Sequence, residues 1–382
     1  MDKFKCVCPC MLGVEGLVAK ELKKLGAEDV EAQNGRVLFK GNSNIMARIN
    51  IGSRYSERVL ILLSCFQATT FEELFEGVRS IPFERWIGKK DIFPVKGSSI
   101  NSKLHSVPDC QSIIKKAIVE RLKSKYHISW FEETEHLYQI QFLIMKDQVS
   151  IMIDTSGQGL HKRGYRTNST EAPIKETLAA SMANLAFINK NTNLIDPFCG
   201  SGTILIESAL YAMNISPGIN RKFTAETWNS TIKKSFDDER QQAIELIDRN
   251  VPFEATGYDI DDNALSLTIE NAKRAGVESK IKVFQRDIKD FQENLDRCTV
   301  ICNPPYGQRL LDIHQAQEIY SLMGKVFKHK KGHNYYIISP DEDFEQFFGR
   351  KSDKRRKLYN GMIKCQFHMY FKWFTYINIK IY

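Results

Sequence analysis

The sequence predicts an α/β protein in which an α+β region precedes a domain built on an open, largely parallel sheet. Two observations support the parallel sheet: short apolar runs, such as 255–258, 281–284 and 298–302, alternate with helical patterns, and the run before residue 196 leads into a glycine-rich turn. A third observation distinguishes the N-terminal part of the chain from the predicted parallel-sheet domain. Residues 1–154 mix strand and helix patterns without this strand–turn–helix repeat.

Size and composition limit the class of protein. The 382 residues can form two or three domains, each with its own core, and 42% of them are hydrophobic. Because the chain lacks a run of eighteen apolar residues and a secretory leader, we expect neither a membrane span nor export. Nine scattered cysteines predict reduced thiols and a cytoplasmic protein. The net charge of +8, most of it within residues 1–170, favours an anionic partner.

The N-terminal segment places Cys6, Cys8 and Cys10 on alternate positions. In a strand these side chains share one face, and no partner pair of Cys or His follows nearby, so we expect a buried face and no bound metal. Helical spacing then predicts a helix over 13–25. Asn34-Gly35 marks a hairpin turn, and Ser43 is expected to cap the next helix.

The rest of the front part, to residue 154, reads as further strands and helices. A helix is predicted over 108–125, and it carries Lys115 and Lys116 among several basic residues. These lysines either lie on an ordinary solvated helix face or contact the phosphates of a nucleic acid.

A glycine-rich stretch follows the apolar residues 194–195 and opens a helix. Glycine lets the backbone approach a ligand closely, as at the first strand–helix turn of nucleotide-binding folds. The stretch lacks the lysine of a phosphate-binding P-loop and the spacing of a dinucleotide-binding motif.

Residues 303–306, Asn-Pro-Pro-Tyr, follow the β-branched run 298–302. Two prolines stiffen the backbone and leave only acceptors, while ligands of open α/β sheets bind at the carboxyl ends of the strands. Oxygen atoms of Asn303 and Pro304 can accept both hydrogens of an exocyclic amino group and aim its lone pair at an electrophile. Tyr306 offers a ring on which a base can stack. A simple turn that ends the strand is the alternative.

Together the two stretches resemble the signature loops of class I S-adenosylmethionine (SAM)-dependent methyltransferases that act on amino nitrogens. The resemblance implies a Rossmann-like catalytic domain, SAM as cofactor, and catalytic positions at Asn303, Pro304, Pro305 and Tyr306. It places Asp259 on the ribose hydroxyls and Asp287 on the adenine amino group; a cap of the next helix is the simpler role for Asp261, and a surface turn is the simpler role for Asp287. The implied cofactor-binding set is Asp196, Phe198, Gly200, Ser201, Gly202, Thr203, Asp259, Ile260, Asp287 and Asn303.

The resemblance extends over most of the chain. Residues 4–41 look like a small ferredoxin-like module, and residues 50–154 look like a THUMP RNA-binding domain. The linker 160–166 and residues 172–180 resemble the RlmL/YpsC-type 23S rRNA guanine-N2 methyltransferases. This resemblance implies a ferredoxin-like module over 1–50, a THUMP domain over 51–158 and a methyltransferase domain over 159–382. It also implies an insertion after residue 213, with a helix over 238–250.

Further basic residues are candidates for RNA contacts. The run 350–357 holds six basic residues among eight. Such runs are often solvated connections, but they also suit phosphate groups. The candidates in the linker and this run are Lys162, Arg163, Arg166, Arg355 and Arg356.

The sequence therefore predicts a cytoplasmic enzyme that methylates N2 of guanine in large-subunit ribosomal RNA. The same corner would serve adenine-N6 methylation, guanine-N2 methylation of tRNA, or methylation of a protein glutamine. A catalytically inactive RNA-binding protein is a further alternative, which the two intact loops disfavour.

Overall fold

A computed structural model of the chain describes residues 3–166, 173–292, 295–306, 313–328 and 330–371. It divides into two compact units. The first unit comprises residues 1–10, 18–160 and 221–242, and the second comprises residues 11–17, 161–220 and 243–382. Among the described residues, none of the helices has the length and apolar character needed to cross a membrane.

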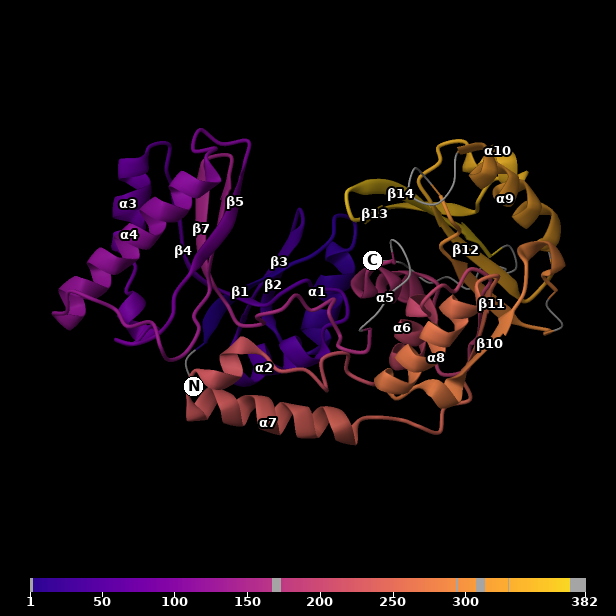
Figure 1. The fold of residues 1–382 in the computed structure, drawn as a ribbon, viewed down its shortest axis with the longest axis horizontal. Coiled ribbons are helices and arrows are strands. Elements are labelled where there is room, and N and C mark those ends of the chain that lie inside the picture. Colours follow the sequence, from indigo (N-terminus) through magenta and orange to yellow (C-terminus); the bar gives the residue numbers. More distant parts are fainter. Residues whose placement is uncertain (1–2, 167–172, 293–294, 307–312, 329, 372–382) are drawn as a thin grey trace. The chain divides into compact units, whose positions relative to one another are not determined.

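The first unit is built on one seven-stranded sheet in the order β2-β3-β1-β4-β7-β6-β5. Neighbouring strands pair antiparallel except β5 and β6, which are parallel. Figure 1 shows α3 and α4 side by side next to these strands. The strands are β1 (Phe4–Pro9), β2 (Glu28–Gln33), β3 (Arg36–Gly41), β4 (Leu60–Gln67), β5 (Val95–Ile100), β6 (Ile140–Met145) and β7 (Gln148–Asp154), and the helices are α1 (Glu15–Lys24), α2 (Ser43–Gly52), α3 (Phe71–Arg79) and α4 (Val107–Tyr126).

Local sequence signals predicted the buried strand face and the hairpin turn of this unit. Cys6, Cys8 and Cys10 are buried, as the predicted strand face requires, and the hairpin turns at Gly35 with a positive φ of 73°. The predicted cap of α2 is wrong by one residue. Asn42 rather than Ser43 caps the helix, because its side chain accepts the N–H of Ile45.

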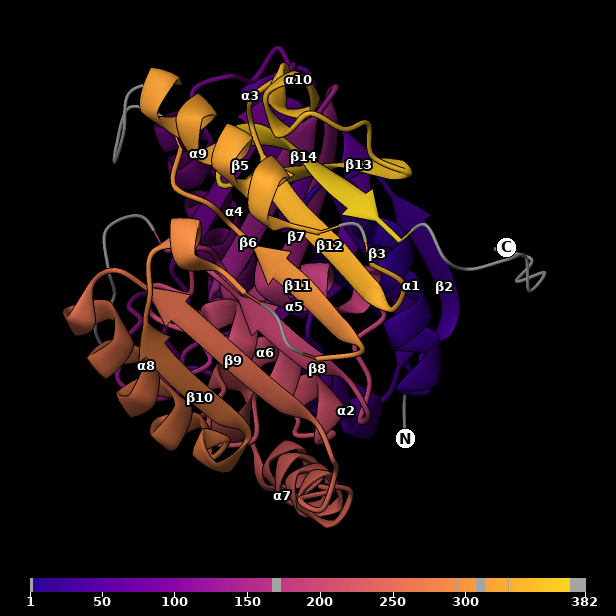
Figure 2. The same cartoon turned by 90° about the vertical axis from the view of Figure 1, so that its right-hand side faces the viewer.

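The second unit contains the predicted open sheet, in the order β10-β9-β8-β11-β12-β14-β13 (Figure 2). The first five strands run parallel, and β14 and β13 complete the sheet in antiparallel pairing. The strands are β8 (Asn193–Asp196), β9 (Glu254–Asp259), β10 (Ile281–Gln285), β11 (Cys298–Cys302), β12 (His333–Ser339), β13 (Lys354–Asn360) and β14 (Ile363–Tyr370), and the helices are α5 (Glu176–Leu185), α6 (Thr203–Ala212), α8 (Asp262–Ala275), α9 (Ile313–Val326) and α10 (Phe344–Phe348).

An aromatic core fixes the β11–β12 side of this sheet. Phe327 stacks on Tyr335 with ring centroids 4.9 Å apart, and Phe344 stacks on Phe348 at 5.3 Å. The strand β11 is buried along its whole length, which explains its β-branched and apolar composition. This rigid strand ends immediately before Asn303.

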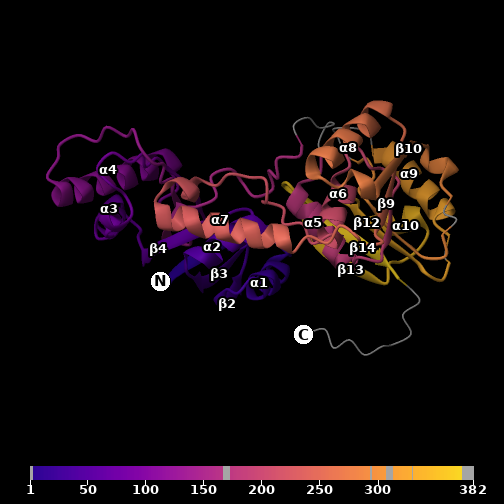
Figure 3. The ribbon, with the colours of Figure 1, turned by 90° about the horizontal axis from the view of Figure 1, so that it is seen from below.

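Part of the segment after α6 belongs to the first unit. Residues 221–242 lead into and form most of α7 (Ser230–Glu245), which runs alongside α2 (Figure 3). Arg48 of α2 donates to both carboxylate oxygens of Glu239, at 2.7 and 2.9 Å. Trp228 stacks on Tyr138 with centroids 4.5 Å apart. The expected insertion is therefore fastened to the N-terminal unit by both charge and aromatic contacts.

The predicted helix within the insertion is misplaced. The helix begins at residue 230 and ends at 245, whereas 238–250 was expected. Asn229 starts it early, because its side chain accepts the N–H of Ile232 at 2.9 Å. A capping residue outside the apolar pattern thus set the boundary.

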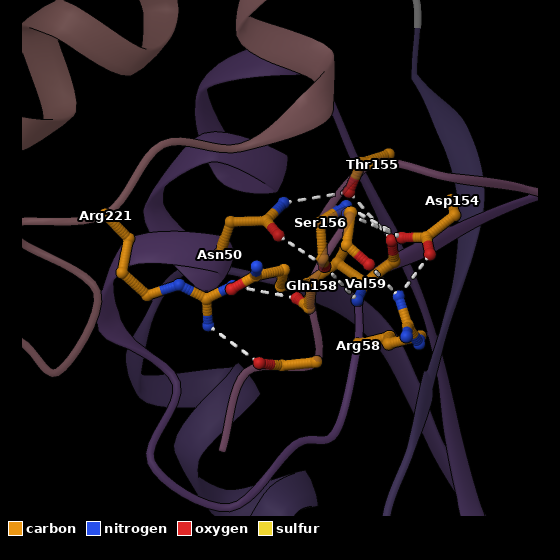
Figure 4. A network of polar contacts seen from close by, with 10 residues as sticks. Asn50, Arg58, Val59, Asp154, Thr155, Ser156, Gln158 and Arg221 are labelled. Atoms are coloured by element: carbon orange, nitrogen blue, oxygen red, sulfur yellow. Dashed lines mark hydrogen bonds and ion pairs between the residues drawn. The ribbon is translucent and has the colours of Figure 1, made fainter. Parts of the chain in front are cut away.

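A polar network closes the first unit where β7 ends (Figure 4). Asn50 donates to Thr155 at 2.9 Å and accepts from Ser156 at 2.6 Å. Arg221 donates to the carbonyls of residues 158 and 159, at 2.7 and 3.0 Å. These buried bonds join α2, the chain leaving β7 and the start of the inserted segment.

Candidate active site

The carboxyl ends of the parallel strands bring the predicted site residues to one edge of the sheet. β8 ends at Asp196, β9 ends at Asp259, Asp287 follows β10, and Asn303 follows β11. β8 pairs with β9 on one side and β11 on the other. The strand order therefore reverses at β8, which is where ligands bind in open α/β sheets.

The glycine-rich turn, residues 197–202, links β8 to α6. Gly200 and Gly202 have positive φ of 51° and 79°, which glycine adopts without strain. A Cβ on Gly202 would lie 2.6 Å from the Cγ2 of Thr268. The turn is therefore restricted to glycine at residue 202 both by backbone conformation and by the neighbouring helix.

Helix α8 supports this turn with two buried polar side chains. Thr268 donates to the carbonyl of Gly200 at 2.8 Å, and Asn271 donates to the carbonyl of Ser201 at 3.0 Å. Sequence analysis missed both residues. The detectable signal is a polar pair, three residues apart, on the otherwise apolar face of a helix.

Asp259 links the loop that follows β8 to the loop that follows β9. Its carboxylate accepts the N–H of Gly200 at 2.8 Å and the N–H of Asp261 at 3.1 Å. Asp261 caps α8, as predicted, by accepting from Asn263 at 2.9 Å. Ile260, between the two aspartates, is 68% exposed and offers an apolar surface at the sheet edge.

Asp196 lies beneath the turn. It is 1% exposed, and its carboxylate accepts the N–H of Phe198 at 3.1 Å. Burial raises the pKa of Asp196 to about 8, and the nearby charge of Asp259 acts in the same direction. Asp196 therefore supports the glycine-rich turn from a buried position, through its hydrogen bond to the backbone of Phe198.

Asp287 caps the short helical turn that follows β10. It accepts the N–H of Lys289 at 2.9 Å and forms an ion pair with its ammonium group at 3.3 Å. The backbone hydrogen bond holds the pKa of Asp287 below its usual range. Its side chain is 40% exposed, so the carboxylate has an open side at the sheet edge.

The corner at residues 303–306 holds a buried acceptor that pairs with none of the described residues. Asn303 Oδ1 is buried, and it has no hydrogen-bond partner among the residues that the structure describes. Pro304 is buried and Pro305 half-buried. A buried acceptor without a partner is costly, so its retention at this edge points to a donor supplied by a ligand.

Tyr306 is held by the hairpin of β13 and β14. Its hydroxyl accepts from Asn360 Nδ2 at 2.7 Å and lies 3.9 Å from Cys365 Sγ. Burial raises the pKa of Tyr306. Sequence analysis missed Asn360, and no local pattern singled it out. The next residue of the motif, Gly307, lies outside the described residues.

Two linker arginines are not available for the phosphate contacts predicted for them. Arg163 is 4% exposed and forms an ion pair with Glu207 at 3.4 Å, and Tyr165 also donates to Glu207 at 3.1 Å. Arg166 forms an ion pair with Glu176 at 2.8 Å and contacts the hydroxyl of Thr203. Arg163 and Arg166 are therefore wrong as RNA contacts, because the buried carboxylates of Glu207 and Glu176 pair with them.

The other basic candidates differ in accessibility. Lys115 pairs with Glu133 at 2.6 Å, and its ammonium lies 3.5 Å from the centre of the Phe93 ring. Arg356 donates to the carbonyl of Gly13 at 2.6 and 3.1 Å. The exposed side chains are those of Lys116, Lys162 and Arg355.

The sheet order, the glycine-rich turn and the Asn-Pro-Pro-Tyr corner define a class I SAM-dependent methyltransferase. Comparison with known domain families agrees. Residues 163–369 match a family described as RMKL-like methyltransferase domain, residues 5–60 match the RlmL ferredoxin-like domain, and residues 68–154 match the THUMP domain. The chain therefore belongs to the RMKL-like methyltransferase family, and SAM is its cofactor.

Individual relatives cover nearly the whole chain. YpsC of Bacillus subtilis (strain 168), named as a candidate RNA methyltransferase, is 41% identical over 97% of this chain and 96% of its own length. The crystal structure of SMU.472, a candidate methyltransferase solved with S-adenosylhomocysteine (SAH), has a TM-score of 0.91 at 40% identity and covers 97% of this chain and 98% of its own. A Listeria monocytogenes protein, described as a predicted N6-adenine-specific DNA methylase, has a TM-score of 0.91 at 42% identity, with 97% and 96% covered.

A second group of relatives is longer. Ribosomal RNA large subunit methyltransferase K/L of Shewanella frigidimarina is 30% identical over 94% of this chain, but the match spans only 51% of that relative. The chain thus spans about half the length of the K/L relatives that it matches.

Proposed function

We propose that this protein is an RNA methyltransferase that transfers a methyl group to N2 of a guanine in 23S ribosomal RNA. The observation that carries the proposal is the buried, unpartnered Oδ1 of Asn303 at the carboxyl end of β11, among the residues described. An exocyclic amino group supplies the donor that this acceptor lacks. The THUMP match supports RNA as the substrate, and the names of the K/L relatives support large-subunit ribosomal RNA.

The residues fit SAM, which supplies a methyl group bound to a sulfonium sulfur. Gly200 and Gly202 let the backbone of the turn come close to the ligand, and a side chain on Gly202 would crowd the turn. Asp259 would accept the ribose hydroxyls, Ile260 would cover a face of the adenine, and Asp287 would accept its amino group. The complete cofactor-binding set is the one predicted from the sequence, with Asp196 acting from beneath the turn.

The catalytic corner would act on the amino nitrogen. Asn303 Oδ1 and the carbonyl of Pro304 would accept its two hydrogens, which draws the nitrogen lone pair out of the ring and stabilises positive charge as it develops on nitrogen. The stiff Pro304-Pro305 backbone fixes these acceptors before the substrate arrives. Tyr306 would stack on the target base after the base leaves its helix.

RNA binding is assigned to the N-terminal unit and to exposed basic side chains. The THUMP match covers residues 68–154, and Lys116, Lys162 and Arg355 are exposed. Phosphate contacts made by such side chains release counterions, so affinity for RNA should fall steeply with salt. A ribosomal RNA substrate would require the protein to act in the cytoplasm.

Adenine-N6 methylation is the second candidate, because an adenine amino group would satisfy Asn303 equally well. The Listeria relative is named for that reaction on DNA. The THUMP match favours RNA over DNA, and the K/L names favour ribosomal RNA. Guanine is preferred over adenine because residues 160–166 and 172–180 resemble the guanine-N2 methyltransferases.

Nucleoside mass spectrometry of RNA from a deletion strain tests the proposal. We expect N2-methylguanosine to decrease in 23S RNA alone, and to return with the wild-type gene but not with Asn303→Ala. Loss of N6-methyladenosine would show that the target base is adenine, and a change confined to tRNA would show that the substrate is tRNA. Unchanged nucleosides in all RNAs would contradict it.

A further inference from the structure

The hairpin of β13 and β14 ends in a tip, residues 359–364, that exposes apolar side chains. The strands pair up to Asn360 and Ile363, which leaves only Gly361 and Met362 in the loop. Gly361 has a positive φ of 65°, as such a short turn requires. Met362 is 99% exposed and Ile363 is 42% exposed. Single exposed apolar residues are common, so a role for Met362 has to be argued from the residues around it.

The hairpin tip is fixed to the catalytic corner. Asn360, at the end of β13, donates to the Tyr306 hydroxyl at 2.7 Å. Cys365, one residue beyond the tip, lies 3.9 Å from the same oxygen. Both strands of the hairpin therefore touch the residue on which the target base is proposed to stack. Met362 therefore lies in a two-residue loop between strands that both contact Tyr306.

The charge of the hairpin suits a polyanion. Residues 354–370 include five basic side chains and no Asp or Glu. The described acidic neighbours pair only loosely: Glu342 lies 3.7 Å from Lys364, and Glu345 lies 3.7 Å from Arg355. Glu342 and Lys364 are both exposed, so their pair contributes little, whereas Glu345 is 19% exposed and also lies 3.5 Å from His368. The basic residues are Lys354, Arg355, Arg356, Lys357 and Lys364.

We propose that the hairpin tip enters the RNA beside the target base, and that Met362 fills the space which the base leaves when it turns out of its stack. This inference rests on the proposed function, since only a base drawn from a stacked strand leaves such a space. Apolar side chains, methionine among them, are inserted between bases by proteins that distort nucleic acids. The basic strands behind the tip would hold the phosphates on either side.

The test requires that the target guanine has first been mapped. It then compares two RNAs that contain this guanine in unmethylated form. In one RNA the guanine is paired within a stem, and in the other it faces an abasic site and is unpaired. Extrusion of the guanine costs more energy from the paired stem than from the position opposite an abasic site. Met362→Ala should therefore lower single-turnover transfer on the stem by roughly tenfold or more, and lower it much less on the unpaired RNA. Met362→Leu should restore transfer on the stem.

Controls separate the role of the tip from folding and from the chemistry. Met362 is fully exposed, so its truncation should leave the melting temperature and SAH affinity unchanged. Ile269→Ala removes a matched apolar side chain, 56% exposed on α8, and should affect neither RNA. Fluorescence of 2-aminopurine placed at the target position should rise with wild type and rise less with Met362→Ala.

Equal loss on both RNAs, or wild-type transfer by Met362→Ala on the stem, would overturn the proposal. Failure of the proposed function gives a different result, because wild type itself would then methylate neither RNA.

Discussion

Thr268 of α8 holds the backbone of the glycine-rich turn, since its hydroxyl donates to the carbonyl of Gly200 at 2.8 Å. The same side chain lies where a Cβ on Gly202 would fall. One buried threonine thus both supports the turn and requires glycine opposite it. This contact connects the second strand–helix unit of the sheet to the first.

Replacing Thr268 by valine should therefore weaken cofactor binding. Valine keeps the packing but leaves the carbonyl of Gly200 without its donor, which costs about 1 to 2 kcal/mol. We expect SAH affinity, measured by calorimetric titration, to fall roughly fivefold to thirtyfold. Glu270→Gln, an exposed change on the same helix, is the control. Equal affinities in the two variants would show that α8 does not position the turn.

Arg163 should prove essential for folding and unimportant for RNA contacts. Arg163→Ala would leave Glu207, which is fully buried, without its charged partner. Removing one member of a buried ion pair costs about 3 to 5 kcal/mol. Urea unfolding should show this loss, while Lys162→Ala, an exposed neighbour, should leave stability unchanged and reduce the salt dependence of RNA binding. Wild-type stability of Arg163→Ala would contradict the buried role.

The pKa of Asp196 predicts how stability changes with pH. Its folded pKa, about 8, exceeds the value of about 4 for an unfolded aspartate, so folding keeps this carboxyl protonated. The stabilisation that this raised pKa gives the folded protein is fully present below pH ~4. It is lost as the pH rises from there to about 8, which lowers the free energy of unfolding by a few kcal/mol. Asp196→Asn should lack this loss when urea unfolding at pH 6 and pH 8.5 is compared. Asp238→Asn, an exposed change, should match wild type. Parallel pH profiles for wild type and Asp196→Asn would refute the assignment.

Sequence patterns predicted the site because they mark where strands end. Asp259 and Asn303 each follow an apolar run, and the parallel pairing of β9, β8 and β11 then brings them to one edge. Their location needed no knowledge of side-chain contacts. The predicted roles of these residues remain predictions, because a strand end fixes position and not chemistry.

Tertiary partners decided what sequence patterns could not. Arg163 and Lys162 are adjacent in a basic linker, yet only Arg163 faces Glu207, forty-four residues later. The position of α7 likewise depends on Arg48 meeting Glu239 across 191 residues. Local charge and periodicity carry no information on such pairs, so the roles of the linker arginines and the packing of α7 against α2 could not be predicted. The start of α7 was missed for a different reason, because the local cap at Asn229 lies outside the apolar pattern.

Asn303→Ala separates a catalytic role of this side chain from a structural one. Its Oδ1 has no partner among the described residues, so Asn303→Ala removes none of their hydrogen bonds to that atom. Melting temperature and SAH affinity should stay close to those of wild type. Methyl transfer should slow by roughly a hundredfold to a thousandfold, the usual cost of one preorganised polar contact to developing charge. Single-turnover transfer of labelled methyl to 23S RNA isolates that step from product release.

Asn303→Asp sharpens the test, because a carboxylate keeps acceptor oxygens, loses the amide donor and adds a negative charge near the sulfonium of the cofactor. SAH and SAM affinities of this variant show whether the added charge disturbs cofactor binding. If Asn303 acts as an acceptor for the amino group, this variant should retain more activity than Asn303→Ala. Asn191→Ala, an exposed asparagine just before the amino end of β8, is the control and should transfer at the wild-type rate. A turn-forming role makes the opposite prediction: stability and cofactor affinity would fall together with the rate. Wild-type transfer by a stable, cofactor-binding Asn303→Ala would exclude this corner as the catalytic site.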